Sequence, residues 1–434
     1  MTVRKIAFAT VLVAATLIAA HGAIAQRPDQ PTQSDRPGEV QGMSRERLAR
    51  IERVMKEQIG KGIFPGAVTL VARRGQVVHF EAYGFLDSAK MKPMTKDAIF
   101  RLASMTKPIV TVAAMMMVEQ GILKLNDPIS SWLPELKDLK VETEKTDKAG
   151  TVTTEDLPAN RPVTVQDLMR HTSGFFYSEA IKSQRLKDTY EKANIEARES
   201  DITGDEMLKR LGHIPLAHQP GTNFHYSIST DVLGLLLERA ANASLDRLLK
   251  ELLLDPLSMK DTAFWVPPGK VERLAEAYDS DPQKVSRLKA SRILANPVGK
   301  SYLKGGAGLV GTAEDYFKFA QMMVNGGELE GRRYLAKKTV EFMLSDHIVG
   351  MGGSTMATTG PGYGFGLGFA VRLYDGYSWV PGSKGDAMWA GAWGTSFTID
   401  PREGLVGILM AQGPSNRVHT RMLFKNLIYG AMVR

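Results

Sequence analysis

Strand-like segments lie near both ends of this 434-residue chain, and helix-like segments fill its middle. Two strands are predicted at residues 67–73 and 76–83, where apolar and β-branched residues flank the turn Arg74-Gly75. Strand patterns return near the other end in four segments, at residues 366–372, 387–391, 395–399 and 405–411. Because strands must bury their apolar faces together, we expect one sheet built from both chain ends, with a large helical insertion. This arrangement is of the α/β (α+β) class.

The first 25 residues have the composition of a cleaved signal peptide. Arg4 and Lys5 form a basic start, residues 6–20 are mainly apolar, and Ala23-Ile24-Ala25 is a small-residue cleavage site. The apolar run is shorter than the roughly 20 residues that span a bilayer. We therefore expect secretion, to the periplasm, with an uncleaved N-terminal anchor as the alternative and no membrane span in the mature chain.

The rest of the chain divides by composition. Residues 26–43 are rich in Gln, Pro, Asp and Ser and are expected to be a disordered leader. Residues 44–434 are expected to form one folded domain. Its sheet part would comprise about 44–103 and 360–434, and its helical part about 104–359. Within the helical part, we expect a surface excursion over residues 136–162 and a lid or a solvated helix over residues 178–214.

Composition excludes several kinds of site. The chain has no cysteine, which rules out a catalytic thiol, thiolate metal sites and a lipid-modified N-terminal cysteine. Loss of the signal peptide would lower the formal net charge from +8 to +6, an excess that suits solubility better than nucleic-acid binding. No His-Glu-x-x-His motif and no Gly-x-Ser-x-Gly elbow occur. The glycine-rich stretch at 305–311 lacks the ending of a phosphate-binding loop. We expect no cofactor and no catalytic metal.

Ser104 and Lys107 form the most informative pair. Positions three apart on a helix share a face, so the lysine amine would lie over the serine hydroxyl. A serine needs a neighbouring base to become a nucleophile. Lysine, with an ordinary pKa of about 10.4, becomes such a base when it is desolvated. The apolar run at 110–118 provides that desolvation, so we expect Ser104 to be the nucleophile and Lys107 its proton partner.

The same spacing occurs twice more, at Ser286/Lys289 and Ser301/Lys304. Only the pair at Ser104 is followed by a long apolar segment. Ser286/Lys289 lies in a basic stretch, and Ser301/Lys304 lies directly before two glycines. His171, near the end of a predicted helix, is favoured as a structural residue because no acid lies at a useful spacing.

From residue 44 to the end, the chain resembles the serine beta-lactamase and penicillin-recognising superfamily, and most of all the class C beta-lactamases and the esterases that share their fold. The resemblance is carried by many segments in order: 64–67, 100–108, 125–128, 168–174, 220–221, 226–227, 255–257, 305–316 and 363–368. It implies an antiparallel sheet flanked by helices. It also implies Ser104 as the acylated nucleophile with Lys107, and Tyr226 as a second base. The oxyanion hole would be the backbone N–H groups of Ser104 and Ala392.

Two positions depart from the beta-lactamase pattern. Ile228 replaces the asparagine of the usual Tyr-x-Asn motif, and Trp389, in Trp389-Ala390-Gly391, replaces the lysine or histidine of the edge strand. That lysine helps to hold the carboxylate of penicillins and of D-Ala-D-Ala peptides, whereas tryptophan offers an apolar wall with one N–H donor. Trp389, Gly391 and Ile228 are the expected substrate-binding residues.

These departures favour a carboxylesterase that acts on small or short-chain esters. Lys384 in a nearby loop could restore a positive charge, which keeps open the alternative of a beta-lactamase or a D-Ala-D-Ala-type peptidase or amide hydrolase. A second alternative is a non-catalytic cell-envelope binding protein on the same fold. The expected ligand is a small ester or amide, and no nucleic-acid partner is expected.

Overall fold

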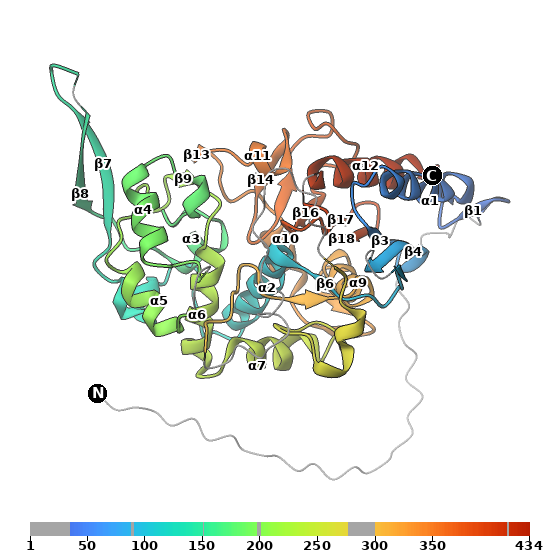
Figure 1. Cartoon of the computed structure of the whole chain (residues 1–434), viewed down its shortest axis with the longest axis horizontal. Coiled ribbons are helices and arrows are strands. Elements are labelled where there is room, and N and C mark those ends of the chain that lie inside the picture. Colours follow the sequence, from blue (N-terminus) through green and yellow to red (C-terminus); the bar gives the residue numbers. More distant parts are fainter. Residues whose placement is uncertain (1–34, 88–90, 151, 198–200, 277–299, 415) are drawn as a thin grey trace, which may run out of the picture.

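An eight-stranded antiparallel sheet forms the centre of the structure, a computed structural model that describes residues 35–87, 91–150, 152–197, 201–276, 300–414 and 416–434 (Figure 1). Its order is β14-β15-β16-β17-β18-β3-β4-β5. The N-terminal part supplies β3 (Gly66–Arg73), β4 (Gln76–Asp87) and β5 (Lys92–Pro93). The C-terminal part supplies β14 (Tyr363–Phe365), β15 (Ala370–Arg372), β16 (Ala387–Ala390), β17 (Ser396–Asp400) and β18 (Leu405–Ala411). Since β18 pairs with β3 in the middle, the expectation of one sheet built from both chain ends is confirmed.

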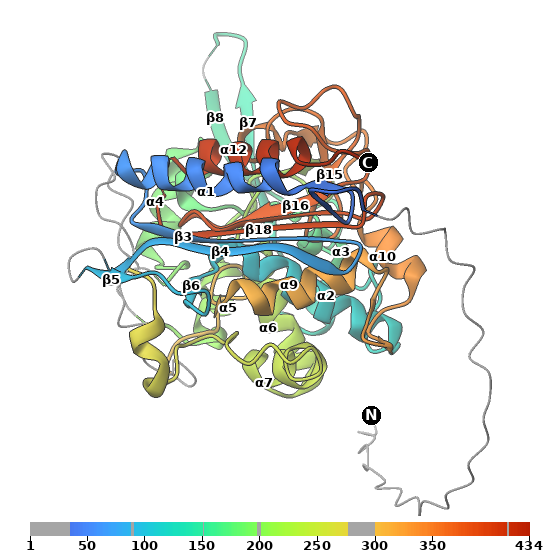
Figure 2. The same ribbon diagram turned by 90° about the vertical axis from the view of Figure 1, so that its right-hand side faces the viewer.

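Alternation along β3 divides the apolar residues between the two faces of the sheet. Ala67 and Val71 belong to a smaller core under helices α1 (Arg45–Gly60) and α12 (Arg417–Gly430), whereas Val68 and Leu70 belong to the main core on the opposite face. Figure 2 shows α1 and α12 side by side over the sheet. The Ser44 hydroxyl caps α1 by accepting the N–H of Arg47, as its position before the helix predicts.

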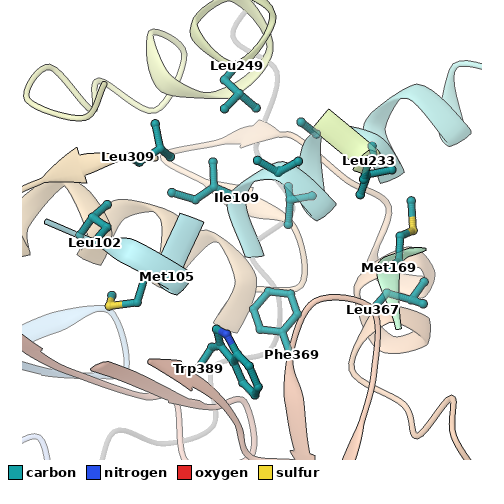
Figure 3. Packing of buried hydrophobic residues seen from close by; sticks show 14 of the residues in the cluster. Leu102, Met105, Ile109, Met169, Leu233, Leu249, Leu309, Leu367, Phe369 and Trp389 are labelled. Carbon is teal, nitrogen blue, oxygen red and sulfur yellow. The ribbon is translucent and has the colours of Figure 1, made fainter. Parts of the chain in front are cut away.

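The other face of the sheet carries the main core and the helices from the middle of the chain. Helix α9 (Ala313–Val324) packs on β17, β18 and β3, and α2 (Thr106–Glu119) lies beside α6 (Ser229–Ala241). Eleven of the 14 residues of α2 are buried, so this helix is surrounded by protein on nearly every side. Figure 3 shows Ile109 of α2 packed within this core, with Phe369 and Trp389 nearby.

The other helices among the described residues are α3 (Val165–Met169), α4 (Gln184–Lys192), α5 (Gly204–Leu211), α7 (Leu245–Leu249), α10 (Lys337–Met343) and α11 (Met356–Thr359). Short helical turns are η1 (Ala103–Met105), η2 (Ile129–Ser131), η3 (Pro134–Leu136), η4 (Ser178–Ala180), η5 (Lys250–Leu254) and η6 (Pro268–Arg273). Five two-stranded pairs complete the fold: β1 (Glu39–Val40) with β2 (Met43–Ser44), β6 (Phe100–Arg101) with β10 (Val310–Gly311), β7 (Lys140–Thr146) with β8 (Val152–Pro158), β9 (Asn223–Phe224) with β13 (Gly352–Gly353), and β11 (Glu328–Leu329) with β12 (Arg332–Arg333).

One expectation needs correction, and one gains detail. The expected disordered leader is too long, because residues 35–43 are folded: β1 and β2 pair, and Val40 and Met43 are buried in the core under α1. The surface excursion at 136–162 contains the regular hairpin β7–β8, which projects from the body in Figure 1. Its residues are mostly polar on both faces, so the sequence carries no apolar alternation that would reveal the strands.

Residues 178–214 contain α4 and α5, each with a buried apolar side and an exposed polar side. The expected signal peptide lies outside the described residues. Within the described part of the chain, no helix combines the length and the apolar character needed to cross a membrane.

Candidate active site

The segment around Ser104 is held rigidly at the start of α2. Ser104 lies in η1, directly before α2, and its neighbour Ala103 has a φ of 46°, a left-handed conformation that costs a non-glycine residue about 1 kcal/mol. The Leu102 N–H donates to Leu309 O at 3.0 Å, and the Leu309 N–H donates to Thr106 Oγ1 at 3.1 Å. Strained backbone held by bonds on both sides is typical of a functional site.

Lys107 lies under Ser104 in the first turn of α2, and its side chain is fully buried. Its Nζ lies 3.4 Å from Ser104 Oγ, 3.0 Å from the Tyr177 hydroxyl and 2.8 Å from the Gly306 carbonyl oxygen. An ammonium group has three donors, and these three contacts match them. The pair that the spacing predicted to share a face does so.

Tyr226 brings a third polar group to the same place. It lies between β9 and α6, and its hydroxyl donates to Ser104 Oγ at 2.7 Å. The Lys107 Nζ lies 4.6 Å from the centre of the Tyr226 ring. Ser104 therefore has an amine on one side and a phenol on the other, an arrangement that can remove the hydroxyl proton and pass it on.

The end of β16 lies against the Ser104 segment. A Cβ on Gly391 would lie 2.5 Å from Leu102 O and 2.3 Å from Thr395 Oγ1, so only glycine allows this approach. The next residue, Ala392, is exposed. The close approach brings the turn after β16 beside Leu102, the residue that precedes η1. The oxyanion hole of Ser104 and Ala392 stays a prediction.

Trp389 and Ile228 are both buried, at 2% and 1% exposure. The Trp389 ring packs edge-on against Tyr226, with centroids 5.2 Å apart, and its Nε1 has no hydrogen-bond partner in the described part of the chain. The indole therefore packs behind Tyr226, and its buried N–H is left without a partner among the described residues. Ile228 packs into the main core, so the structure does not bring its side chain to the surface of the site. Lys384 is exposed on the loop before β16.

Tyr177 is a candidate functional residue that sequence reasoning missed. Its hydroxyl bonds to Lys107, its ring lies 5.6 Å from that of Tyr226, and burial raises its pKa well above the ordinary value, helped by nearby Asp231. It follows the buried Phe175 and Phe176 in a loop, where nothing in the local sequence distinguishes it from a core aromatic residue.

The other candidates lie apart from this cluster or act structurally. The Lys304 Nζ donates to the Glu196 carbonyl oxygen at 2.6 Å, and the Ser286/Lys289 pair lies outside the described residues. His171 has a φ of 58°, is 1% exposed, and contacts Ser227 Oγ at 3.2 Å through Nδ1. Burial holds its pKa well below 6.5, which fits the predicted structural role. No group of three metal-ligating residues occurs among the residues described.

Comparisons with known proteins show the family of the chain. The family model named Beta-lactamase matches residues 51–428. Protein Rv1367c of Mycobacterium tuberculosis is 33% identical over 366 residues, which cover 82% of this chain and 88% of that protein. Esterase EstB of Burkholderia gladioli is 31% identical over 381 residues, which cover 83% of this chain and 89% of EstB.

The solved structure of EstCE1, a hydrolase with promiscuous acyltransferase activity, superimposes with a TM-score of 0.74 at 27% identity, covering 89% of this chain and 99% of EstCE1. The expected resemblance and fold class are thereby confirmed. The chain belongs to the beta-lactamase family and is a serine hydrolase of that fold.

Proposed function

We propose that this protein is a carboxylesterase that hydrolyses small or short-chain esters through an acyl-enzyme on Ser104. The observation that carries the proposal is the contact of Ser104 Oγ with the Tyr226 hydroxyl at 2.7 Å, beside the buried Lys107 amine. Similarity to EstB and EstCE1, whose names describe an esterase and a hydrolase, supports the same reaction class.

In the proposed reaction, the Tyr226 phenol first gives its proton to the Lys107 amine. Ser104 Oγ then attacks the ester carbonyl while its own proton passes to the Tyr226 phenolate, which the Lys107 ammonium stabilises. The carbonyl oxygen becomes negative and is stabilised by the N–H groups of Ser104 and Ala392. The C–O bond to the alcohol then breaks, and the alcohol leaves with the proton from Tyr226. Water, activated by the same groups, releases the acid and restores Ser104.

Trp389 is the reason for preferring esters to carboxylated lactams. The position beside Tyr226 that would hold a lysine or histidine holds a buried indole, which cannot form an ion pair with a carboxylate. Lys384 is the cation that would bind the carboxylate of a lactam. Its side chain is exposed on a loop, and its backbone N–H bonds to the side chain of Asp375. Beta-lactam or D-Ala-D-Ala hydrolysis remains the second candidate, because it would use the same serine, lysine and tyrosine.

The test compares turnover of p-nitrophenyl acetate, a chromogenic cephalosporin and a D-Ala-D-Ala peptide by purified protein. We expect ester turnover that Ser104→Ala abolishes and Ser301→Ala, the matched change in another Ser-x-x-Lys sequence, leaves intact. Rapid lactam turnover with negligible esterase activity would reject the ester assignment. Esterase activity that survives Ser104→Ala would reject the site.

We also propose export through cleavage after Ala25. Expression of the full chain in a Gram-negative host, followed by cell fractionation and N-terminal sequencing, should give a periplasmic protein that begins at Gln26. A cytoplasmic protein that retains its first residues would contradict this.

A further inference from the structure

Asp231 is a buried carboxylate next to the site, and the proposed reaction gives it no role. It lies in the first turn of α6 and is 3% exposed. Its Oδ1 accepts the N–H of Gly306 at 3.1 Å. Because burying a carboxylate is costly unless it meets donors or positive charge, its position against Gly306, a residue that contacts Lys107, requires an explanation.

Gly306 connects Asp231 to Lys107 through its backbone. While its N–H bonds to Asp231, its carbonyl oxygen accepts from the Lys107 Nζ at 2.8 Å. A Cβ on Gly306 would lie 2.4 Å from Asp231 Oδ2, and one on Gly305 would lie 2.5 Å from the Thr230 carbonyl oxygen. The two glycines therefore allow this turn to lie directly on the start of α6. The glycine-rich stretch that lacks the features of a phosphate-binding loop serves here to hold a lysine.

The charges around Asp231 also link it to Lys107. The positive charges of Lys107 and Lys304 stabilise the Asp231 carboxylate, and the negative charge of Glu196 opposes it. Burial raises the pKa of Asp231, and both lysines oppose that rise. The Tyr177 phenol also lies within the electrostatic reach of Asp231.

We propose that Asp231 is a positioning residue for Lys107. Its carboxylate is the counter-charge for the lysine amine, and through Gly306 it fixes the carbonyl group that receives one of the lysine N–H bonds. Lys107 then keeps its Nζ on Ser104 throughout the proton transfers. This inference rests on the proposed function, because it assigns Lys107 to the proton path.

The test is Asp231→Asn, which removes the charge and keeps an oxygen that can accept the Gly306 N–H. We expect kcat for p-nitrophenyl acetate to fall about tenfold, with KM within about twofold of wild type. We also expect the acid limb of the kcat/KM profile to move about one pH unit lower. A buried negative charge favours the uptake of a proton near it, so without that charge the enzyme should stay active to lower pH.

Asp315→Asn is the matched control. Asp315 is also buried in the first turn of its helix, α9, where it accepts the N–H of Asp261 at 2.7 Å and the Thr262 hydroxyl at 3.0 Å. We expect this variant to melt at a lower temperature with an unshifted pH profile. Asp231→Ser, which also removes the charge and leaves a hydroxyl acceptor, should give the same shift and replaces Asp231→Asn should the latter not fold.

The outcomes separate the two proposals. An active wild type whose Asp231→Asn and Asp231→Ser variants keep the wild-type acid limb, or shift no more than Asp315→Asn, would overturn the role of Asp231 and leave the esterase assignment standing. A wild type that neither hydrolyses esters nor is labelled by a fluorophosphonate would overturn the esterase assignment, and this inference with it.

Discussion

Replacing Tyr226 with phenylalanine isolates the proton path. The change removes only the hydroxyl that donates to Ser104 Oγ at 2.7 Å. The ring remains, and with it the edge contact to Trp389 at 5.2 Å and the position of Lys107 Nζ 4.6 Å from the ring centre. Because the walls of the site stay in place, any loss of rate reports on the missing proton acceptor.

General acid–base catalysis contributes roughly 10²–10⁴-fold, which corresponds to about 3–5 kcal/mol of transition-state stabilisation. We therefore expect Tyr226→Phe to lower kcat at least about 100-fold, with KM within about threefold of wild type. Tyr177→Phe is the matched control, since it removes a hydroxyl that contacts Lys107 at 3.0 Å instead of the one that donates to Ser104. A lost hydrogen bond to a charged group, worth about 1.5 kcal/mol, predicts only a roughly tenfold fall.

The assay is steady-state hydrolysis of p-nitrophenyl acetate by both variants, with thermal melting to show that each is folded. If Tyr226→Phe keeps kcat within threefold of wild type, the phenol is not the proton acceptor. If Tyr177→Phe loses more activity than Tyr226→Phe, the roles of the two tyrosines are reversed.

Three further changes test other parts of the account. Gly391→Ala places a Cβ 2.5 Å from Leu102 O, so we expect kcat to fall at least about tenfold as the strand end moves away; an unchanged kcat would contradict the close approach. Trp389→Lys should raise the rate on a cephalosporin relative to an acetate ester, and equal relative rates would count against the role given to the indole. His79→Gln tests how protonation of His79 changes stability with pH. Burial lowers the pKa of His79 to about 4, so its imidazole stays neutral in the folded protein, whereas in the unfolded chain it takes up a proton below pH 6.5. Wild type should lose about 2 kcal/mol more unfolding free energy than the variant between pH 7 and pH 5 in urea titrations, and equal losses would refute the assignment.

Much of the fold could be predicted because its signals are local. Helix α1 begins after its Ser44 cap and ends at Gly60, as its apolar periodicity predicts, and the strands at both ends carry continuous apolar runs. The hairpin β7–β8 was missed because it buries almost nothing, so its residues follow no apolar alternation.

The residues of the site also divide into those that the sequence predicted and those that it did not. The spacing of Ser104 and Lys107 is local, and family resemblance led to Tyr226. Tyr177 reaches Lys107 from 70 residues away, and Asp231 reaches it through the backbone of another loop. Such contacts form only when the chain folds, so neither residue type nor sequence spacing predicts them. For Ile228 the motif comparison predicted a substrate-binding residue, but its side chain is buried in the core.

The central claim is that Ser104 forms the covalent intermediate. Its most direct test is peptide mapping by mass spectrometry after reaction of the protein with a fluorophosphonate or a slowly released ester. We expect one adduct, on the peptide that contains Ser104, and none in Ser104→Ala. An adduct on another residue, such as Ser301, or an undiminished adduct in Ser104→Ala would contradict the account.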